Sequence, residues 1–395
     1  MSIAKKIEAN LSRSSWIRRM FEQGTLLKAE HGADKVYDFT IGNPNLEPPA
    51  EFEQALAAAV QNPAAGLHGY MPNAGYPFVR KAVAEYLTQE QGLPITANEV
   101  IMTCGAAGAL NVVLKTLLDP GDEVLCPRPY FLEYGFYADN HGGVLQTVPT
   151  RPDFSLDLDA FAHALTPRTK VVLINSPNNP TGQIYSHESL TALGDLLRRD
   201  GHAHNRTIYL VADEPYRKIV YEQRNVPSVL PCYAESIIMT SYSKDLSIPG
   251  ERLGFLAINP AAADKDLFLA GAIMSNRILG FVNAPALMQR VVAAVQGKSV
   301  DCAIYQKKRD LLCDGLAACG YAVTKPAGAF YLFLKTPIAD DIEFVNALQQ
   351  ELILAVPGSG FGGPGHIRLA YCVDDPTILN ALPGFQRVRE KYGEM

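Results

Sequence analysis

The chain has 395 residues, and 48% of them are hydrophobic, which is enough to bury a sizeable core. Its 35 basic and 41 acidic residues give a net charge of −6, which argues against nucleic-acid binding as its main function. No run approaches the roughly 18 apolar residues that a membrane span needs. We therefore expect neither a nucleic-acid partner nor a membrane partner.

The N-terminus and the cysteines favour a cytoplasmic protein. Residues 1–20 mix charged and apolar side chains, so we expect an amphipathic surface helix there and not a secretory signal. The seven cysteines form no Cys-x-x-Cys pair, which makes structural zinc and thioredoxin-like redox chemistry improbable, and no metal site is predicted. An odd number of cysteines on a long chain fits reduced thiols.

The first part of the chain predicts helices separated by short strands and turns. In chain order we expect a strand-like run over 36–41, a helix over 51–61, a helix ending at 87 after the loop 70–77, a strand over 101–103 and a helix over 109–118. Small residues fill the turn 104–108 before the last of these helices. Such a turn exposes backbone N–H groups and the positive helix end, which suits an anion, although many such turns only allow close packing.

The middle of the chain alternates strands with helices. We expect strands over 123–126, 144–148, 170–174, 208–211, 236–239 and 255–258, with helices over 131–140, 158–165 and 187–199. This alternation predicts an α/β fold with a mostly parallel central sheet covered by helices. Ligands bind at the carboxyl ends of strands in such sheets, and Asn175, Asp213 and Lys244 each lie at or just past a strand end.

The last third changes character and predicts a smaller α+β domain. We expect helices over 301–319, 342–351 and 377–392, and strands over 330–334, 352–356 and 367–371. The expected division is an N-terminal segment, 1–40, which joins the small domain, a large ligand-binding domain, 41–296, and a C-terminal small domain, 297–395.

Two predicted strands converge on a loop that carries Lys244, two serines, Ser241 and Ser243, and Arg252. A lysine in a pocket can lose its proton, because desolvation penalises the ammonium more than the amine, and a neutral amine forms an imine with an aldehyde. Hydroxyls and a guanidinium can hold a phosphate. Pyridoxal 5′-phosphate (PLP) is an aldehyde that carries a phosphate. The alternative is an exposed loop with an ordinary surface lysine.

Other polar residues occur where such a ligand would need them. Residues 175–182, Asn-Ser-Pro-Asn-Asn-Pro-Thr-Gly, predict a rigid turn whose asparagine can bind a ligand oxygen, or else a plain strand-to-helix turn. Asp213 at a buried strand end needs a partner such as a protonated pyridine nitrogen, and Tyr216 could reach a phenolic oxygen of the same ring. The alternative for Asp213 is a capping role.

Two C-terminal features need opposite interpretations. Arg368 lies in a short apolar strand, where a substrate carboxylate or a protein carboxylate would satisfy its charge. Residues 358–363 match G-x-G-x-x-G by letter, but Pro364 and a strand follow them. A dinucleotide-binding loop must open a helix, so we reject this match.

These motifs together resemble the class I/II aminotransferases, the fold-type I PLP enzymes of the aspartate aminotransferase superfamily. The likeness extends from Ile41-Gly42-Asn43-Pro44 to Arg368, with Asn-x-Pro-x-Asn-Pro-Thr-Gly, Asp-Glu-x-Tyr and Ser-x-Ser-Lys in the family's order. It implies amino-group transfer from an L-amino acid to a 2-oxo acid through pyridoxamine phosphate, in a ping-pong reaction.

The resemblance also implies a role for each matching residue. Lys244 corresponds to the Schiff-base lysine and proton-transfer base, and Asp213 to the partner of the pyridine nitrogen. The other implied contacts are Asn179 and Tyr216 with the phenolic oxygen, Ser241, Ser243, Arg252 and the backbone of Ala106 and Ala107 with the phosphate, Phe131 with the ring face, and Arg368 and the Gly42 backbone with the substrate carboxylate. Tyr70 corresponds to a tyrosine that the neighbouring subunit lends to the phosphate, which implies a homodimer.

Some points stay open at this stage. Ala106 and Ala107 stand where relatives often carry a Ser or Thr side chain, and Arg277 is only a candidate for binding a distal carboxylate, so the preferred amino acid is undetermined. The nearest alternative activity is a PLP lyase of the same fold, either a carbon–sulfur β-lyase or of the aminocyclopropane-carboxylate synthase type. A PLP-sensing regulator would need a DNA-binding module, for which the first 40 residues are too few.

Overall fold

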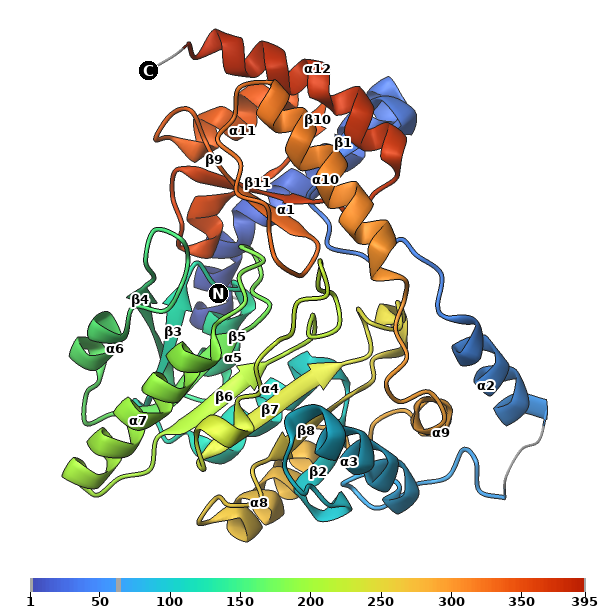
Figure 1. Cartoon of the computed structure of the whole chain (residues 1–395), viewed down its shortest axis with the longest axis vertical. Coiled ribbons are helices and arrows are strands. Elements are labelled where there is room, and N and C mark those ends of the chain that lie inside the picture. The colour runs from blue at the N-terminus through green and yellow to red at the C-terminus, as the bar shows by residue number, and fades with distance from the viewer. Residues whose placement is uncertain (1–2, 62–64, 394–395) are drawn as a thin grey trace.

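The computed structural model describes residues 3–61 and 65–393. Figure 1 shows a larger lower body built from the middle of the chain and a smaller upper body. The upper body combines the C-terminal third with the end of the first helix, α1 (Lys5–His31). That helix begins where the sequence predicts one but continues well past residue 20. No helix among the described residues is both long enough and apolar enough to cross a membrane.

A seven-stranded sheet forms the centre of the larger body. Its strands are, in spatial order, β2 (Val100–Thr103), β8 (Gly254–Ile258), β7 (Ser236–Ser241), β6 (Tyr209–Asp213), β5 (Thr169–Asn175), β3 (Glu123–Arg128) and β4 (Val144–Pro149). β8 runs antiparallel to both of its neighbours, and the pairs from β7 to β4 are parallel. The predicted mostly parallel sheet is therefore confirmed.

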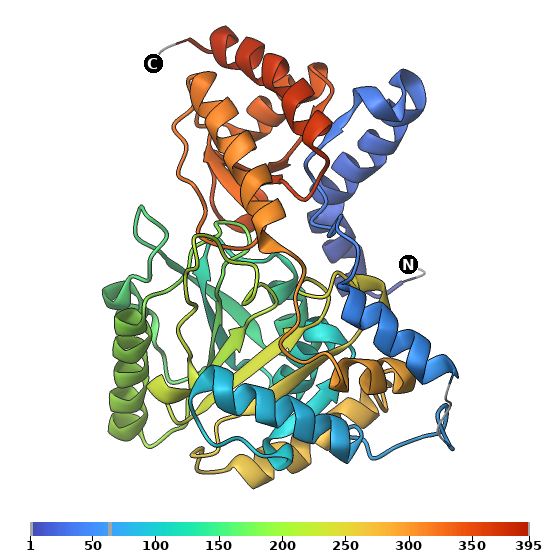
Figure 2. The same cartoon turned by 45° about the vertical axis from the view of Figure 1, so that its right-hand side comes forward.

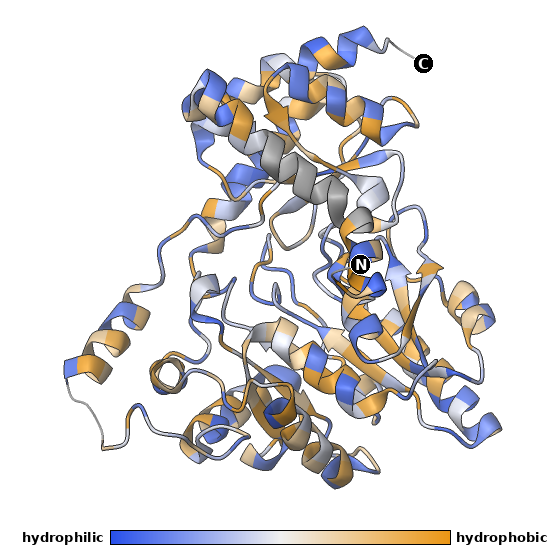
Figure 3. Ribbon diagram, turned by 180° about the vertical axis from the view of Figure 1, so that it is seen from behind, coloured by the Kyte–Doolittle hydropathy of each residue, from blue (hydrophilic) through white to orange (hydrophobic). Residues whose placement is uncertain are grey.

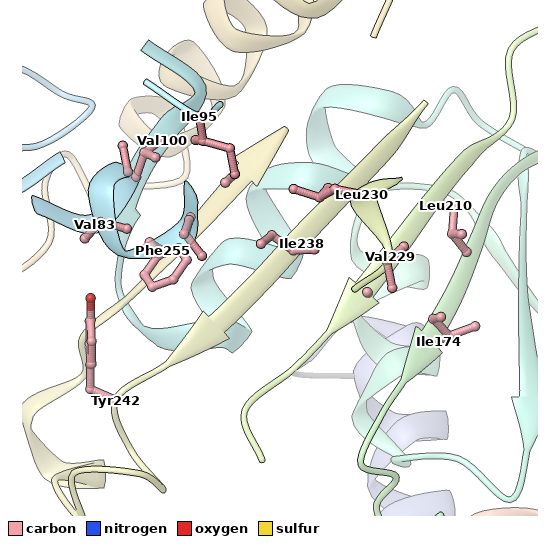
Figure 4. Close-up of a cluster of buried hydrophobic side chains, with 14 of the residues drawn as sticks. Val83, Ile95, Val100, Ile174, Leu210, Val229, Leu230, Ile238, Tyr242 and Phe255 are labelled. Atoms are coloured by element: carbon pink, nitrogen blue, oxygen red, sulfur yellow. The ribbon is translucent and has the colours of Figure 1, made fainter. Parts of the chain in front are cut away.

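Alternating side chains divide the core of this body into two clusters. Along β2, Val100 and Met102 belong to one cluster and Ile101 to the other. The period of two in a strand sends successive side chains to opposite faces, so a sheet buried on both faces needs continuous apolar runs. Figure 4 shows part of the first cluster, and Figure 3 shows hydrophobic colouring along the central strands.

Helices cover both faces of the sheet, as predicted. The helices of the larger body are α2 (Ala50–Gln61), α3 (Pro77–Gln91), α4 (Gly105–Leu117), α5 (Glu133–Asn140), α6 (Leu158–Ala164), α7 (His187–His204), α8 (Lys265–Ile278) and α9 (Ala286–Ala293). The helices α3, α6, α7 and α9 contribute to the first cluster, and α4, α5 and α8 to the second. Figure 2 shows α2 beside α9. The sequence analysis did not predict α8 and α9.

The smaller body is an antiparallel sheet with three helices. Its strands are β9 (Tyr331–Lys335), β11 (Val356–Pro357) and β12 (His366–Ala370), and its helices are α10 (Cys302–Ala318), α11 (Asp341–Gln350) and α12 (Asp375–Lys391). The predicted strand over 352–356 is instead two strands, because β10 (Ile353–Leu354) pairs with β1 (Tyr37–Asp38) while β11 pairs with β12.

Backbone hydrogen bonds join the N-terminal segment to the smaller body. Phe39 donates to the Leu354 carbonyl at 3.0 Å and accepts from the Ala370 amide at 2.8 Å. Phe39 also belongs to the third hydrophobic cluster, together with residues of β9, α10, α11 and α12. These contacts support the division into 1–40, 41–296 and 297–395, which we retain as a proposal.

Candidate active site

A cavity of about 470 Å³ lies at the carboxyl ends of β5, β6 and β7, where the two bodies meet. Register places Asn175 at the end of β5 beside Asp213 at the end of β6, and Asp213 beside Met239 of β7. The predicted site residues that line this cavity are Gly42, Ala106, Ala107, Phe131, Asn179, Asp213, Tyr216, Ser241, Ser243, Lys244, Arg252 and Arg368. Parallel strand ends thus gather residues that are far apart in sequence, as expected for this kind of sheet.

Lys244 follows β7 by three residues and is held inside the cavity. Its Nζ donates a hydrogen bond to the Gly42 carbonyl at 2.9 Å, and it lies 5.4 Å from the centre of the Phe330 ring. Burial, together with the positive charges of Arg368 and Arg252, lowers the pKa of Lys244 to about 8. A lysine with that pKa presents a substantial fraction of neutral, nucleophilic amine near neutral pH.

Asp213 is buried with only one of its oxygens hydrogen-bonded. Its Oδ2 accepts a 2.6 Å hydrogen bond from the Tyr134 hydroxyl, whereas Oδ1 is buried without a partner among the described residues. Burial raises the pKa of Asp213 to about 6, and the Tyr134 hydrogen bond opposes that rise. A buried acceptor without a donor is costly, so Oδ1 is suited to a donor that enters the cavity.

Sequence analysis missed Tyr134. This residue lies in α5, belongs to the second hydrophobic cluster, and packs its ring edge-on against Phe131 at 5.5 Å. The spacing of three residues from Phe131 and the need of a buried phenol for a partner were the available signals. Its partner Asp213 is 79 residues away, so those signals alone do not identify it.

Asn179 and Arg368 are held together at another side of the cavity. The backbone N–H of Asn179 donates to Asn175 Oδ1 at 2.7 Å, and Asn175 Nδ2 donates to the backbone carbonyl of Asp213 at 2.8 Å. Arg368 Nη1 donates to Asn179 Oδ1 at 3.2 Å. The proline-containing turn over 175–182 therefore places Asn175 and Asn179 in the site, which supports the ligand-binding interpretation over a plain turn.

Arg368 has no ion pair with a described residue, although it is buried. Its Nη2 donates to the Thr40 carbonyl at 2.7 Å, and its Nε has no partner among the described residues. The guanidinium contacts two aromatic rings, 4.6 Å from the centre of Tyr331 and 4.7 Å from that of Phe361. Of the two sequence-based alternatives, no carboxylate in the described part of the chain pairs with Arg368, and the free Nε–H favours an incoming anion.

A further part of the cavity wall combines a helix N-terminus with hydroxyls and a guanidinium. α4 begins at Gly105, and Ala106 and Ala107 in its first turn line the cavity with Ser241, Ser243 and Arg252. Gly105 has φ +71°, and a Cβ there would lie 3.1 Å from Arg252 Nη2. The donors present, which are backbone N–H groups at a helix start, two hydroxyls and one guanidinium, match those that hold phosphates.

Two predicted residues lie outside the cavity. Tyr70 is 94% exposed and lines a separate surface recess with Met71, Phe281 and Asn283. Arg277 is exposed near the end of α8 and does not line the cavity. Both assignments stay predictions, since each would require a residue that reaches the site of another subunit.

Comparison with known proteins places the chain in a family. The model of the family "Aminotransferase class I and II" matches residues 34–384. An aspartate/prephenate aminotransferase from Thermus thermophilus is 33% identical over 359 residues, with 88% of this chain and 90% of that protein covered. An aspartate aminotransferase from Geobacillus stearothermophilus is 32% identical over 410 residues, with 99% of each covered.

Solved structures agree with these sequence matches. A crystal structure of an aminotransferase from Eubacterium rectale has a TM-score of 0.96 and 38% identity, with 100% of both chains covered. A mutant aspartate aminotransferase from Thermus thermophilus has a TM-score of 0.87 and 29% identity, covering 98% of this chain and 100% of the other. The fold is the α/β fold of type I, and the chain belongs to aminotransferase class I and II, as the sequence motifs predict. It is an enzyme of the aminotransferase class.

Asp213→Asn tests the electrostatics of the site in the cofactor-free protein. The pKa of about 6 in the folded state lies above the ordinary value of 3.8, so the folded protein holds a proton that the unfolded chain has released. The contribution of Asp213 to the free energy of unfolding therefore falls as pH rises from about 4 to 6, by up to about 3 kcal/mol. The variant should lose this part of the pH dependence in denaturant titrations.

Asp195→Asn is the matched control for that experiment, because Asp195 forms an exposed ion pair with Arg198 at 2.5 Å. This variant should keep the pH dependence of the unmodified protein. Parallel curves for the unmodified protein and Asp213→Asn would contradict the description of Asp213 as a buried carboxylate with a raised pKa.

Proposed function

We propose that this enzyme uses pyridoxal 5′-phosphate to move the amino group of an L-amino acid to a 2-oxo acid by a ping-pong mechanism. The observation that carries the proposal is that a lysine with a lowered pKa and a carboxylate with an unpartnered buried oxygen line one cavity. Family membership and the names of the relatives support the same activity.

The residues present fit the four functional groups of PLP. Lys244 is the amine for the aldehyde, and Asp213 Oδ1 is the acceptor for a protonated ring nitrogen. Asn179 and Tyr216 are donors for the phenolic oxygen, and Phe131 offers a ring face. The phosphate matches Ser241, Ser243, Arg252 and the start of α4, where Ala106 and Ala107 can contribute only backbone N–H groups. When bound, the cofactor supplies a ring that accepts electrons from the substrate carbon.

Each residue's contribution to the reaction follows from its position. Lys244 Nζ, once neutral, is the base that removes the proton from the substrate Cα. Asp213 keeps a negative charge opposite the ring nitrogen, because a cationic partner favours the ionised carboxylate despite burial. Arg368 binds the α-carboxylate through its Nε–H, which has no partner among the described residues, and the Gly42 carbonyl accepts the hydrogen bond of Lys244.

The alternatives have less support. The relatives compared above are named aminotransferases, and nothing in the cavity favours a β-lyase or an aminocyclopropane-carboxylate synthase type of lyase. The glycine-rich stretch over 358–363 includes a short 3-10 helix, Gly358–Phe361, and is followed by β12, so it does not open the α-helix that dinucleotide binding requires. The first 40 residues hold α1, which does not form a DNA-binding module by itself.

The physiological amino acid is left open by the cavity. The cationic side chains that line it are Lys244, Arg252 and Arg368, and each already has a role. A distal carboxylate would therefore need a cation from elsewhere, such as Arg277 of a second subunit. We also infer a cytoplasmic location, which the unpaired thiols support.

We further propose a homodimer in which Tyr70 of each subunit serves the phosphate site of the other. The exposure of Tyr70 outside the cavity supports this arrangement, since a residue so exposed in one chain is available to a second. Other large apolar side chains, Phe78, Met274 and Ile278, are exposed as well. Exposed apolar side chains of this size are available for an interface between subunits.

Lys244→Ala tests the catalytic proposal. The variant should lose the visible absorbance of the lysine-bound cofactor and at least about a thousandfold in turnover, because it lacks both nucleophile and base. The unmodified enzyme, mixed with a single amino acid, should release its cofactor as pyridoxamine phosphate, which mass spectrometry detects. Repeating this half-reaction across the amino acids identifies the preferred substrate.

Lys298→Ala is the control for that measurement, because Lys298 forms an exposed ion pair with Glu51 away from the cavity. It should retain both the absorbance and turnover. Full activity in Lys244→Ala would exclude the mechanism. Release of pyruvate and ammonia without pyridoxamine phosphate would establish a β-lyase instead.

Subunit mixing tests the sharing of Tyr70. Lys244→Ala and Tyr70→Ala, each inactive or strongly impaired alone, should regain activity when their subunits are exchanged, because the mixed dimer contains one site with both an intact Lys244 and an intact Tyr70. Each mixed dimer should approach half the activity of the unmodified dimer. No recovery, despite mixed dimers seen by native mass spectrometry, would contradict the shared site.

A further inference from the structure

A buried tyrosine that sequence analysis did not single out connects two parts of the cavity. Tyr331 begins β9 and is 3% exposed. Across the sheet it lies opposite Ala370, which is two residues after Arg368 on the same face of β12. Its ring consequently lies against the guanidinium of Arg368, at 4.6 Å. Tyr331 and Arg368 both line the cavity.

The hydroxyl of Tyr331 lies where a side chain at position 42 would otherwise be. A Cβ on Gly42 would lie 1.8 Å from this oxygen, so only a glycine allows the two to coexist. The Gly42 carbonyl accepts the hydrogen bond from Lys244, so Lys244 and Tyr331 both approach the same backbone residue. The close approach gives a physical reason for glycine at position 42.

The same hydroxyl lies 2.9 Å from the hydroxyl of Tyr216, and either oxygen can donate. A phenol has one hydrogen to give. If Tyr216 donates to the phenolic oxygen of the cofactor, its own oxygen becomes the acceptor, and Tyr331 must be the donor. Hydrogen bonds in such a chain polarise one another, so donation by Tyr331 strengthens donation by Tyr216.

We propose that Tyr331 is a positioning residue that links the arginine for the substrate carboxylate to the tyrosine that donates to the cofactor. This inference rests on the function proposed above. The link runs from the Arg368 guanidinium, through the Tyr331 ring and hydroxyl, to the Tyr216 hydroxyl. It is separate from the direct hydrogen bond between Arg368 and Asn179. Substrate binding at Arg368 therefore affects the phenolic oxygen of the cofactor by two routes, one through Asn179 and one through Tyr331 and Tyr216.

The charged and titratable groups around this link come from several elements. Tyr331 interacts with Arg368 of β12, with Cys372 just after that strand, and with Tyr216, which follows β6. The ring of Tyr216 in turn lies near the Nζ of Lys244, which follows β7. Burial raises the pKa of the Tyr331 hydroxyl, and the positive charge of Arg368 opposes that rise, which favours its role as a donor. The Cys372 thiol, whose pKa burial raises to about 12, stays neutral and does not compete.

Tyr331→Phe tests the proposal on the purified enzyme loaded with PLP. The substitution removes the hydroxyl and keeps the ring beside Arg368. Without its donor, Tyr216 stabilises the ionised phenolic oxygen less, and the neighbouring imine nitrogen of the lysine-bound cofactor holds its proton more tightly. The pKa of that imine, read as the pH midpoint of the absorbance change, should therefore rise by about half a unit or more. The KM for the amino acid should change less than about threefold, because the ring still stacks on the arginine.

Two further variants separate the link from a merely structural role. In a Tyr216→Phe background, removing the Tyr331 hydroxyl should shift the midpoint no further, since the effect passes through Tyr216. Tyr371→Phe is the matched control: Tyr371 is a buried tyrosine whose hydroxyl bonds that of Tyr221 at 3.1 Å, and it does not line the cavity. This control should leave the midpoint unchanged.

The outcomes distinguish this inference from the proposed function. An unshifted midpoint in Tyr331→Phe, or an equal shift in the Tyr216→Phe background, would overturn the link and leave the aminotransferase assignment standing. If the unmodified protein shows no absorbance of a lysine-bound cofactor, the proposed function itself fails. If Tyr331→Phe does not fold, 3-fluorotyrosine at position 331, which keeps the hydroxyl in place and makes it a stronger donor, should lower the midpoint. An unchanged or raised midpoint would contradict the proposal.

Discussion

The site depends on burying opposite charges without pairing them inside the protein. Lys244, Arg368 and Asp213 line one cavity. The lysine donates to a backbone carbonyl and the arginine to a side-chain amide oxygen and a backbone carbonyl, while one oxygen of the aspartate has no partner within residues 3–61 and 65–393. Internal salt bridges would neutralise these groups and remove their chemistry. A ligand with a cationic ring nitrogen and anionic groups supplies the missing partners, so its binding relieves the cost of burial.

The fold keeps these charges apart by drawing them from different elements. Asp213 ends β6, Lys244 follows β7, and Arg368 comes from β12 in the other body. The central sheet fixes the first two through its register, while the third depends on how the smaller body sits on the larger one. Gly42 lies at that junction, and its contacts with Lys244 and Tyr331 couple the position of the smaller body to the geometry of the lysine.

The strand ends and the chemistry of the motifs could be predicted from the sequence, because both are local. Apolar runs marked the parallel strands, and Asn179, Asp213, Lys244 and Arg252 follow such runs or stand in short motifs. Tyr134 and Tyr331 were not predicted, because their hydrogen bonds join residues 79 and 115 positions apart. A tyrosine in an apolar stretch is also usually a core residue. The helices α8 and α9 were not predicted, although Asp264 and Gly280 flank α8. The split between β10 and β11 depends on partners elsewhere in the chain.

The most direct test of this account is to fix the cofactor chemically where it binds. Treating the PLP-loaded enzyme with borohydride should reduce the bond between the lysine and the cofactor, and peptide mapping by mass spectrometry should find the added pyridoxyl phosphate on Lys244. The account predicts modification of this lysine close to one per chain, and its loss when Asp213 and Arg252 are both replaced. Modification spread over surface lysines, or concentrated on another lysine, would contradict it.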